Sequence, residues 1–264
     1  MRKGIAGIGF VFALAVVCSF AAAQTHPPAQ NAPHAAATYD RALLTPSLLT
    51  RRAPDVYKVK VVTTKGPFVI TVTRAWAPNG ADRFYNLVRH HYYDGASFFR
   101  VLNGFVAQFG LSAYPDVNKV WVNANIKDDP VKESNITGYV TFAAAGSNTR
   151  TTQVFVNLND NSGSLDHSSF APFAPFGQVT EGMDVVNQLY SGYGEGAPDG
   201  HGPTQDAVAN KGHEYLEKNF PKLDSIKTAE IVLPAAAPTP APKPAANPAP
   251  KPAATPAPKP PAAR

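Results

Sequence analysis

The chain has 264 residues, of which 44% are hydrophobic and 16% are charged, and its formal net charge is +5 at pH 7. Most of this charge comes from the two ends. Omitting Arg2 and Lys3 lowers it to +3, and omitting the last four cations lowers it to −1. The central part of the chain is therefore close to neutral, and we expect no nucleic-acid partner because a strongly basic surface is lacking.

The N-terminus has the three parts of a secretory signal peptide. Arg2 and Lys3 precede an apolar run over residues 5–20, which is short for a membrane-spanning helix, and small residues follow. We predict removal of residues 1–23 by cleavage after Ala23, and export to the periplasm or the extracellular space. Cys18 is the only cysteine. The exported chain would have no thiol, which excludes disulfides, cysteine catalysis and thiolate metal sites.

Residues 24–53 have the composition of a linker, apart from an apolar patch at Leu43, Leu44, Leu48 and Leu49. The patch suits a short helix packed against the following domain, and it equally suits a linker. We expect residues 24–53 to be partly ordered.

Residues 54–233 are enough for one domain with a substantial core. Apolar residues alternate with lysines over 57–61, and the alternation recurs over 68–72 after a Lys65-Gly66 turn. This pattern predicts a hairpin of two half-buried strands. The next segment predicts a helix, because Pro78 suits a first helical turn and apolar residues recur at helical spacing as far as His91.

The stretch Phe98–Gly110 reads FFRVLNGFVAQFG and places an arginine and a glutamine among large apolar residues. On an extended strand Val106 and Gln108 share a face, because residues two apart point the same way. Arg100 and Gln108 must find partners or face a groove. One interpretation is a core strand pair with the arginine stem buried and its head in water. The other is a binding groove.

The rest of the domain shows further strand and helix patterns. We predict strands over 138–142, 153–156, 176–179 and 226–233, a helix over 183–189 capped by Thr180, and an insertion over 191–222 with one short helix. The glycine-rich part of the insertion, 192–202, lacks the context of a phosphate-binding loop, so we interpret it as a flexible loop. The histidines show no regular ligand spacing, and we expect no metal.

Two segments resemble the cyclophilin family. FFRVLNGFVAQFG meets every fixed position of the family signature F-x-R-V-x-x-G-F-x-x-Q-x-G, and GYVTFAAAGSNTRTTQVF over 138–155 resembles a second family block. The resemblance covers roughly 57–232. It implies a mostly β fold, an eight-stranded antiparallel barrel capped by two helices, and peptidyl-prolyl cis-trans isomerase activity without a cofactor. Together with the leader, it suggests a secreted bacterial type.

The resemblance also implies roles for individual residues. Arg100 would be the catalytic hydrogen-bond donor, and Gln108 would orient the substrate carbonyl. Gln153 would brace the arginine or line the groove. The candidates for the proline pocket and its borders are Phe105, Val106, Phe155, Leu165, the backbone at Ala143 and Ala144, Thr149, and either Phe170 or Phe173, of which we choose Phe173. Taken singly, the apolar candidates equally suit an ordinary core.

Three residues depart from the family pattern. Val106 stands where many relatives have methionine, and Ala144 stands where asparagine is common. Ser164 stands where eukaryotic relatives have a tryptophan that helps to bind cyclosporin. The resemblance therefore implies weak or no cyclosporin binding.

The resemblance and the leader together predict an exported, monomeric isomerase that acts on proline-containing polypeptides during folding of envelope or secreted proteins. The alternative is a cyclophilin-like binding or chaperone module with little isomerase turnover, motivated by the altered pocket rim and the long insertion.

From residue 234 onwards the chain is almost only Pro, Ala and Lys, in the repeats TPAPKPAA, NPAPKPAA and TPAPKPPA. Such a tail has no large apolar side chain to bury, so we predict a disordered, extended polyproline-II spacer over 234–264. We favour a role as a spacer or a weak electrostatic contact with the anionic cell envelope. The alternative is that its Ala-Pro sequences compete weakly for the groove, which tethering would assist.

Overall fold

The structure is a computed structural model, and it describes residues 39–232. The predicted signal peptide, the first part of the 24–53 segment and the Pro/Ala/Lys tail lie outside the described residues. Within the part of the chain that is described, no helix is long and apolar enough to cross a membrane.

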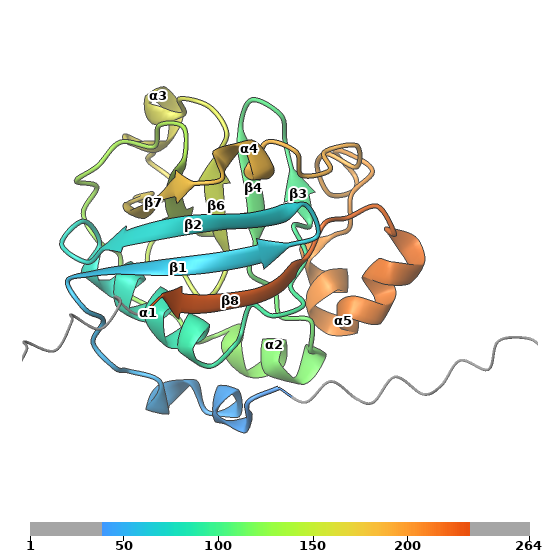
Figure 1. The fold of residues 1–264 in the computed structure, drawn as a ribbon, viewed down its shortest axis with the longest axis horizontal. Helices are drawn as coiled ribbons and strands as arrows, with labels where there is room; N and C mark the ends of the chain where they lie inside the picture. The colour runs from blue at the N-terminus through green and yellow to red at the C-terminus, as the bar shows by residue number, and fades with distance from the viewer. Residues whose placement is uncertain (1–38, 233–264) are drawn as a thin grey trace, which may run out of the picture. The chain divides into compact units, whose positions relative to one another are not determined.

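One eight-stranded antiparallel sheet forms the framework, in the order β3-β4-β6-β5-β7-β2-β1-β8 (Figure 1). The strands are β1 Val56–Thr63, β2 Gly66–Thr73, β3 Arg100–Val101, β4 Val106–Phe109, β5 Tyr139–Phe142, β6 Val154–Asn157, β7 Pro175–Glu181 and β8 Ile226–Val232. The sheet curls into a half-barrel, and the prediction of a mostly β fold with eight antiparallel strands is confirmed.

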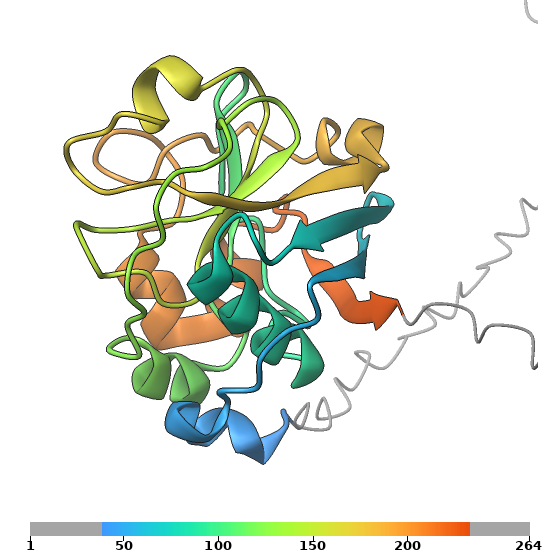
Figure 2. The same cartoon turned by 90° about the vertical axis from the view of Figure 1, so that its left-hand side faces the viewer.

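The two ends of the sheet approach each other where residues before β3 meet residues before β8. Ser97 and Ser225 form an antiparallel bridge, and the Phe98 amide donates to the Asp224 carbonyl at 2.9 Å. Figure 2, turned by 90°, shows the curl of the sheet and β8 (red) beside β1. This near-closure satisfies backbone groups that an open edge would leave unpaired.

The helices differ in detail from the sequence prediction. They are α1 Pro78–Arg89, α2 Pro115–Trp121, α3 Ser162–Leu165, α4 Met183–Val186 and α5 Gln205–Asn219. The first ends at Arg89 rather than reaching His91, whose φ of 56° is incompatible with a continuing helix. Thr180 is not the predicted cap, because β7 continues to Glu181 and Gly182 precedes α4. The short helix predicted in the insertion is the fifteen-residue α5, which is kinked at Gly212.

The strands of the hairpin bury one face, whereas β4 and β6 bury both. Along β1 buried residues alternate with exposed or half-buried ones, as the sequence pattern predicts. All four residues of β4 and all four of β6 are buried. The sequence of a strand that is buried on both faces is typically a continuous apolar run, so we expect no alternation of apolar and polar residues there.

The apolar patch near residue 43 packs against the domain as two 3₁₀ turns, η1 Arg41–Leu44 and η2 Pro46–Leu48. Leu43 is buried, and its carbonyl accepts a hydrogen bond from Trp121 Nε1 at 2.8 Å. Figures 1 and 2 both show these turns (blue) beside α2. The structure therefore agrees with the first interpretation of the patch, in which it packs against the following domain.

Two glycines of the Phe98–Gly110 stretch give a matched stability test. Gly110 has a φ of +111°, and a Cβ there would lie 2.5 Å from the Thr152 carbonyl oxygen. Gly104 has a φ of +75° and open space around a Cβ. We expect Gly104→Ala to destabilise the fold by about 1 kcal/mol through backbone strain alone, and Gly110→Ala by about 3 kcal/mol or more, because steric overlap is added.

Urea unfolding of the two alanine variants measures the difference. Equal losses of unfolding free energy would contradict the close approach of Gly110 to the backbone at Thr152, just before β6.

Candidate active site

Pairing across three strands places the central polar residues in one row. Arg100 of β3 lies opposite Gln108 of β4, and Gln108 lies opposite Phe155 of β6. Directly opposite residues in an antiparallel pair point to the same face. Val106, two residues before Gln108, shares that face, as the sequence pattern predicts.

These side chains line a pocket of about 320 Å³. Nine of the eleven residues nominated from the sequence surround it, together with two from the insertion: Arg100, Phe105, Val106, Gln108, Ala143, Ala144, Phe155, Leu165 and Phe173, with Glu195 and Gln205. One wall is aromatic and aliphatic, and the opposite edge is polar. Such a pocket can hold a small apolar ring and present hydrogen-bond donors to its edge. The substrate-binding roles of these residues remain predictions.

Phe173, rather than Phe170, faces the pocket. Phe173 packs edge-on against Phe155 with ring centroids 6.2 Å apart, whereas Phe170 is 58% exposed. The loop that carries Phe173 is tied to the sheet by Asn135, which is fully buried. The Asn135 Nδ2 donates to the Phe173 carbonyl at 2.8 Å and to Asp166 Oδ1 at 2.9 Å. A buried amide with both donors satisfied holds this wall in place.

Gln153 and Thr149, the remaining two nominated residues, are not among those lining the pocket. Gln153 nevertheless contacts the site, because its Oε1 accepts a hydrogen bond from Gln108 Nε2 at 2.9 Å. Thr149 closes the loop after β5, where its Oγ1 accepts from the Ala145 amide and donates to the Gly146 carbonyl, both at 2.8 Å. Gln153 therefore supports Gln108, and through it Arg100.

A chain of hydrogen bonds runs along the polar edge of the pocket. Arg100 Nη1 donates to Gln108 Oε1 at 3.1 Å. Gln108 Nε2 donates to Gln153, and Gln153 Nε2 donates to Gln205 Oε1 at 3.0 Å. Each of these amide groups accepts one hydrogen bond and donates the next. Because the arginine can only donate, it sets the donor-to-acceptor direction of the whole series of hydrogen bonds.

Glu195 of the insertion is the principal partner of Arg100. The Arg100 Nε lies 2.8 Å from both carboxylate oxygens, and Nη2 lies 2.8 Å from Oε2. Hydrogen bonding from Arg100 lowers the pKa of the Glu195 carboxyl below its ordinary value, against the smaller opposing effect of burial. The amide of Gly196 also donates to Oε1 at 3.0 Å. Sequence reasoning missed Glu195 and Gln205, because the insertion shows no motif that links either to Arg100.

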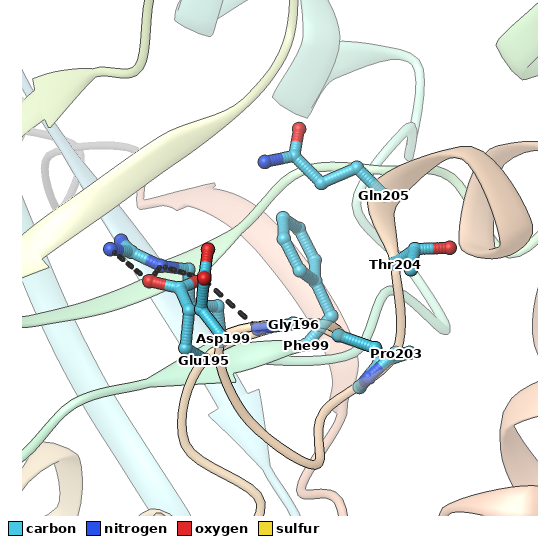
Figure 3. Close-up of a pocket in the computed structure, with 9 residues that line it drawn as sticks. Phe99, Glu195, Gly196, Asp199, Pro203, Thr204 and Gln205 are labelled. Atoms are coloured by element: carbon cyan, nitrogen blue, oxygen red, sulfur yellow. Dashed lines mark hydrogen bonds and ion pairs between the residues drawn. The ribbon is translucent and has the colours of Figure 1, made fainter.

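A second, smaller cavity of about 170 Å³ adjoins the pocket (Figure 3). Arg100, Glu195 and Gln205 line both cavities, so they form the partition between them. The outer side is built from the insertion, including Asp199, and from Phe99 beneath. Within residues 39–232, no group of three or more possible metal ligands gathers at this or any other place.

Known proteins share this fold and sequence. The model of the family "Cyclophilin type peptidyl-prolyl cis-trans isomerase/CLD" matches residues 58–210. The peptidyl-prolyl cis-trans isomerase cyp18 of Streptomyces antibioticus is 35% identical over 150 residues, which cover 54% of this chain and 88% of that protein. Peptidyl-prolyl cis-trans isomerase A of Dickeya dadantii is 29% identical over 135 residues, which cover 50% and 70%.

A solved structure agrees with the fold. The crystal structure of a cyclophilin-type isomerase from Cryptosporidium parvum superposes with a TM-score of 0.50 at 17% identity, covering 68% of this chain and 99% of that one. The chain belongs to the cyclophilin family. Its central domain is a cyclophilin-type peptidyl-prolyl cis-trans isomerase domain, as the two sequence blocks predict.

The contact with Arg100 predicts how Glu195 titrates. Because the folded-state pKa is lowered, the contact stabilises the fold fully above the ordinary carboxyl pKa, and this contribution is lost as the pH falls through the lowered value. We expect Arg100→Ala to raise the pKa of Glu195, measured by carbon NMR titration of the glutamate carboxyls. Other glutamate signals serve as internal controls. An unchanged Glu195 midpoint would show that the ion pair does not form in solution.

Proposed function

We propose that this chain is an exported isomerase that accelerates rotation about X–Pro bonds during the folding of envelope or secreted proteins. The proposal rests on one observation, which is that a fixed guanidinium lines an apolar pocket. Arg100 Cζ lies 5.7 Å from the ring centre of Phe105, which lines the pocket wall. The pocket suits a proline ring, and the guanidinium suits the amide next to it.

Rotation of an X–Pro bond needs a partner for the twisted amide rather than a nucleophile. Resonance sets a barrier of about 18–20 kcal/mol, and the uncatalysed reaction takes tens to hundreds of seconds. When the amide twists, resonance is lost and the electron pair returns to the nitrogen. A donor that is stronger toward this state than toward the planar one lowers the barrier. No bond to the substrate has to form or break.

Arg100 fits the donor role because a guanidinium stays protonated at all physiological pH values. Only 20% of its side chain is exposed, so its hydrogen bonds face little competition from water. Gln108 is 5% exposed and held by Gln153, which gives it a fixed direction for orienting a substrate carbonyl. Ala143 and Ala144 would contact the peptide through their backbone.

The alternative, a binding module with little turnover, is not favoured. It requires a site in which the donor or the pocket is lost. Here the arginine, the glutamine and the aromatic wall line one cavity, and the changes at Val106 and Ala144 leave the cavity open at about 320 Å³.

The substrate class that we propose is proline-containing polypeptide, bound by a monomer. Ser164, which stands at the rim position relevant to cyclosporin, is exposed, and its hydroxyl donates to the Asn161 carbonyl at 3.1 Å. It offers no aromatic surface for an apolar macrocycle, which supports the proposal of weak or no cyclosporin binding.

Prolyl isomerisation of a short Ala-Pro peptide by the mature chain tests the activity. We expect catalysis by the wild type and a loss of kcat/KM of about 10²–10³-fold in Arg100→Ala, the scale seen when one preorganised donor is removed. Arg100→Lys is the matched control, because it keeps the charge but loses the forked geometry, and we expect an intermediate loss.

Urea unfolding confirms that each variant is folded. Equal and negligible rates in well-folded wild type and variants would refute the isomerase and favour the binding module.

Processing tests the proposed export. We expect N-terminal sequencing of the protein from intact cells to begin at Gln24, in the periplasmic or extracellular fraction. Ala23→Tyr should block processing, because the cleavage site requires a small residue. An unprocessed wild-type chain in the cytosolic fraction would contradict the proposal.

A further inference from the structure

We propose that Glu195 is a positioning residue for Arg100, so that the insertion over 191–222 completes the catalytic site. This inference rests on the proposed isomerase function, in which Arg100 is the donor. It gives the insertion a role in the reaction, which its sequence alone does not indicate.

Glu195 holds the guanidinium by one complete edge. Both carboxylate oxygens accept from Nε at 2.8 Å, and Oε2 also lies 2.8 Å from Nη2, so the ion pair runs along one edge of the guanidinium and fixes its direction as well as its distance. Gln108 accepts from Nη1, and the ring of Phe105 lies against the guanidinium. The side chain is therefore held at two edges and one face.

Donors remain for a substrate. A guanidinium has five N–H groups; Glu195 faces the edge formed by Nε and Nη2, and Gln108 accepts from one N–H of Nη1. Within the described part of the chain, one N–H of Nη1 and the N–H of Nη2 that points away from Nε make no hydrogen bond. That Nη2 N–H lies on the edge of the guanidinium opposite Nε, and Arg100 lines the 320 Å³ pocket. Glu195 thus orients the guanidinium without using all of its donors.

The segment that carries Glu195 is closed on itself rather than extended. The backbone carbonyl of Glu195 accepts a hydrogen bond from the Gly202 amide at 2.8 Å, and Gly196 forms a parallel β-bridge with Gly202. Tyr193 packs edge-on against Phe220, with ring centroids 5.2 Å apart, which ties the loop to the residue that follows α5. The stretch 192–202 is a loop, as the sequence predicts, and several contacts hold the Glu195 carboxylate in place.

A fixed arginine has a kinetic advantage. A free arginine side chain loses rotamer entropy when it is ordered, and this loss slows the reaction unless the side chain is already ordered in the free enzyme. Misplacement of a catalytic group by about 1 Å can slow a reaction by about 10²-fold. The opposing possibility is that the carboxylate competes with substrate for the donors, and it predicts faster catalysis without Glu195.

The decisive experiment compares Glu195→Gln with Asp199→Asn in the full mature chain, with an Ala-Pro peptide. Both changes remove one negative charge from the same loop, but only Glu195 contacts Arg100. We expect Glu195→Gln to lower kcat about tenfold with little change in KM, because the amide cannot accept at both positions. Asp199→Asn should leave both parameters close to those of the wild type.

A double-variant cycle separates positioning from a general structural effect. In an Arg100→Ala background, Glu195→Gln should cause no further loss, because there is no guanidinium to position. A further tenfold loss there, an equal loss in Asp199→Asn, or unchanged or faster catalysis in Glu195→Gln would each overturn the inference. Wild-type chain without isomerase activity would instead overturn the proposed function itself. Unfolding midpoints of all variants check that the comparisons are made on folded protein.

Discussion

The register of β3, β4 and β6 is the constraint on which the site depends. Arg100, Gln108 and Phe155 share one row because each lies opposite the next, and a slip of one residue would turn Gln108 away from the pocket. The full burial of β4 and β6 opposes such a slip, since it would exchange well-packed side chains for others of different volume. The chemistry of the pocket edge is thus fixed by the packing of the core behind it.

Local sequence patterns predicted the elements whose form depends on residues close together in the sequence. The hairpin of β1 and β2 follows from alternation, and the start of α1 follows from Pro78. The pocket candidates came from the family resemblance rather than from any pattern of burial. Glu195 was not predictable in this way, because it meets Arg100 across 95 positions of sequence. Spacing rules describe neighbours on one strand or helix, and they carry no information about which loop folds back over a site.

The pocket combines two kinds of support. Its apolar wall is held by a buried amide network around Asn135, where each donor has a partner and a missing one would carry a substantial penalty. Its polar edge is held by charge, through the ion pair between Arg100 and Glu195. The wall belongs to the common barrel, whereas the acidic half of the edge comes from the insertion. The same sheet can therefore keep its pocket of about 320 Å³ while the insertion alters the environment of Arg100.

The place of β8 in the sheet has a consequence for how the chain folds as it is synthesised. β8 pairs with β1, and beside them Thr64 Oγ1 donates to Asp224 Oδ1 at 2.6 Å across 160 positions. Until the last strand has emerged, β1 has an unpaired edge that can pair with other chains, and the loop that must close is long. The half-barrel can therefore form only after the strand that ends at Val232 has emerged.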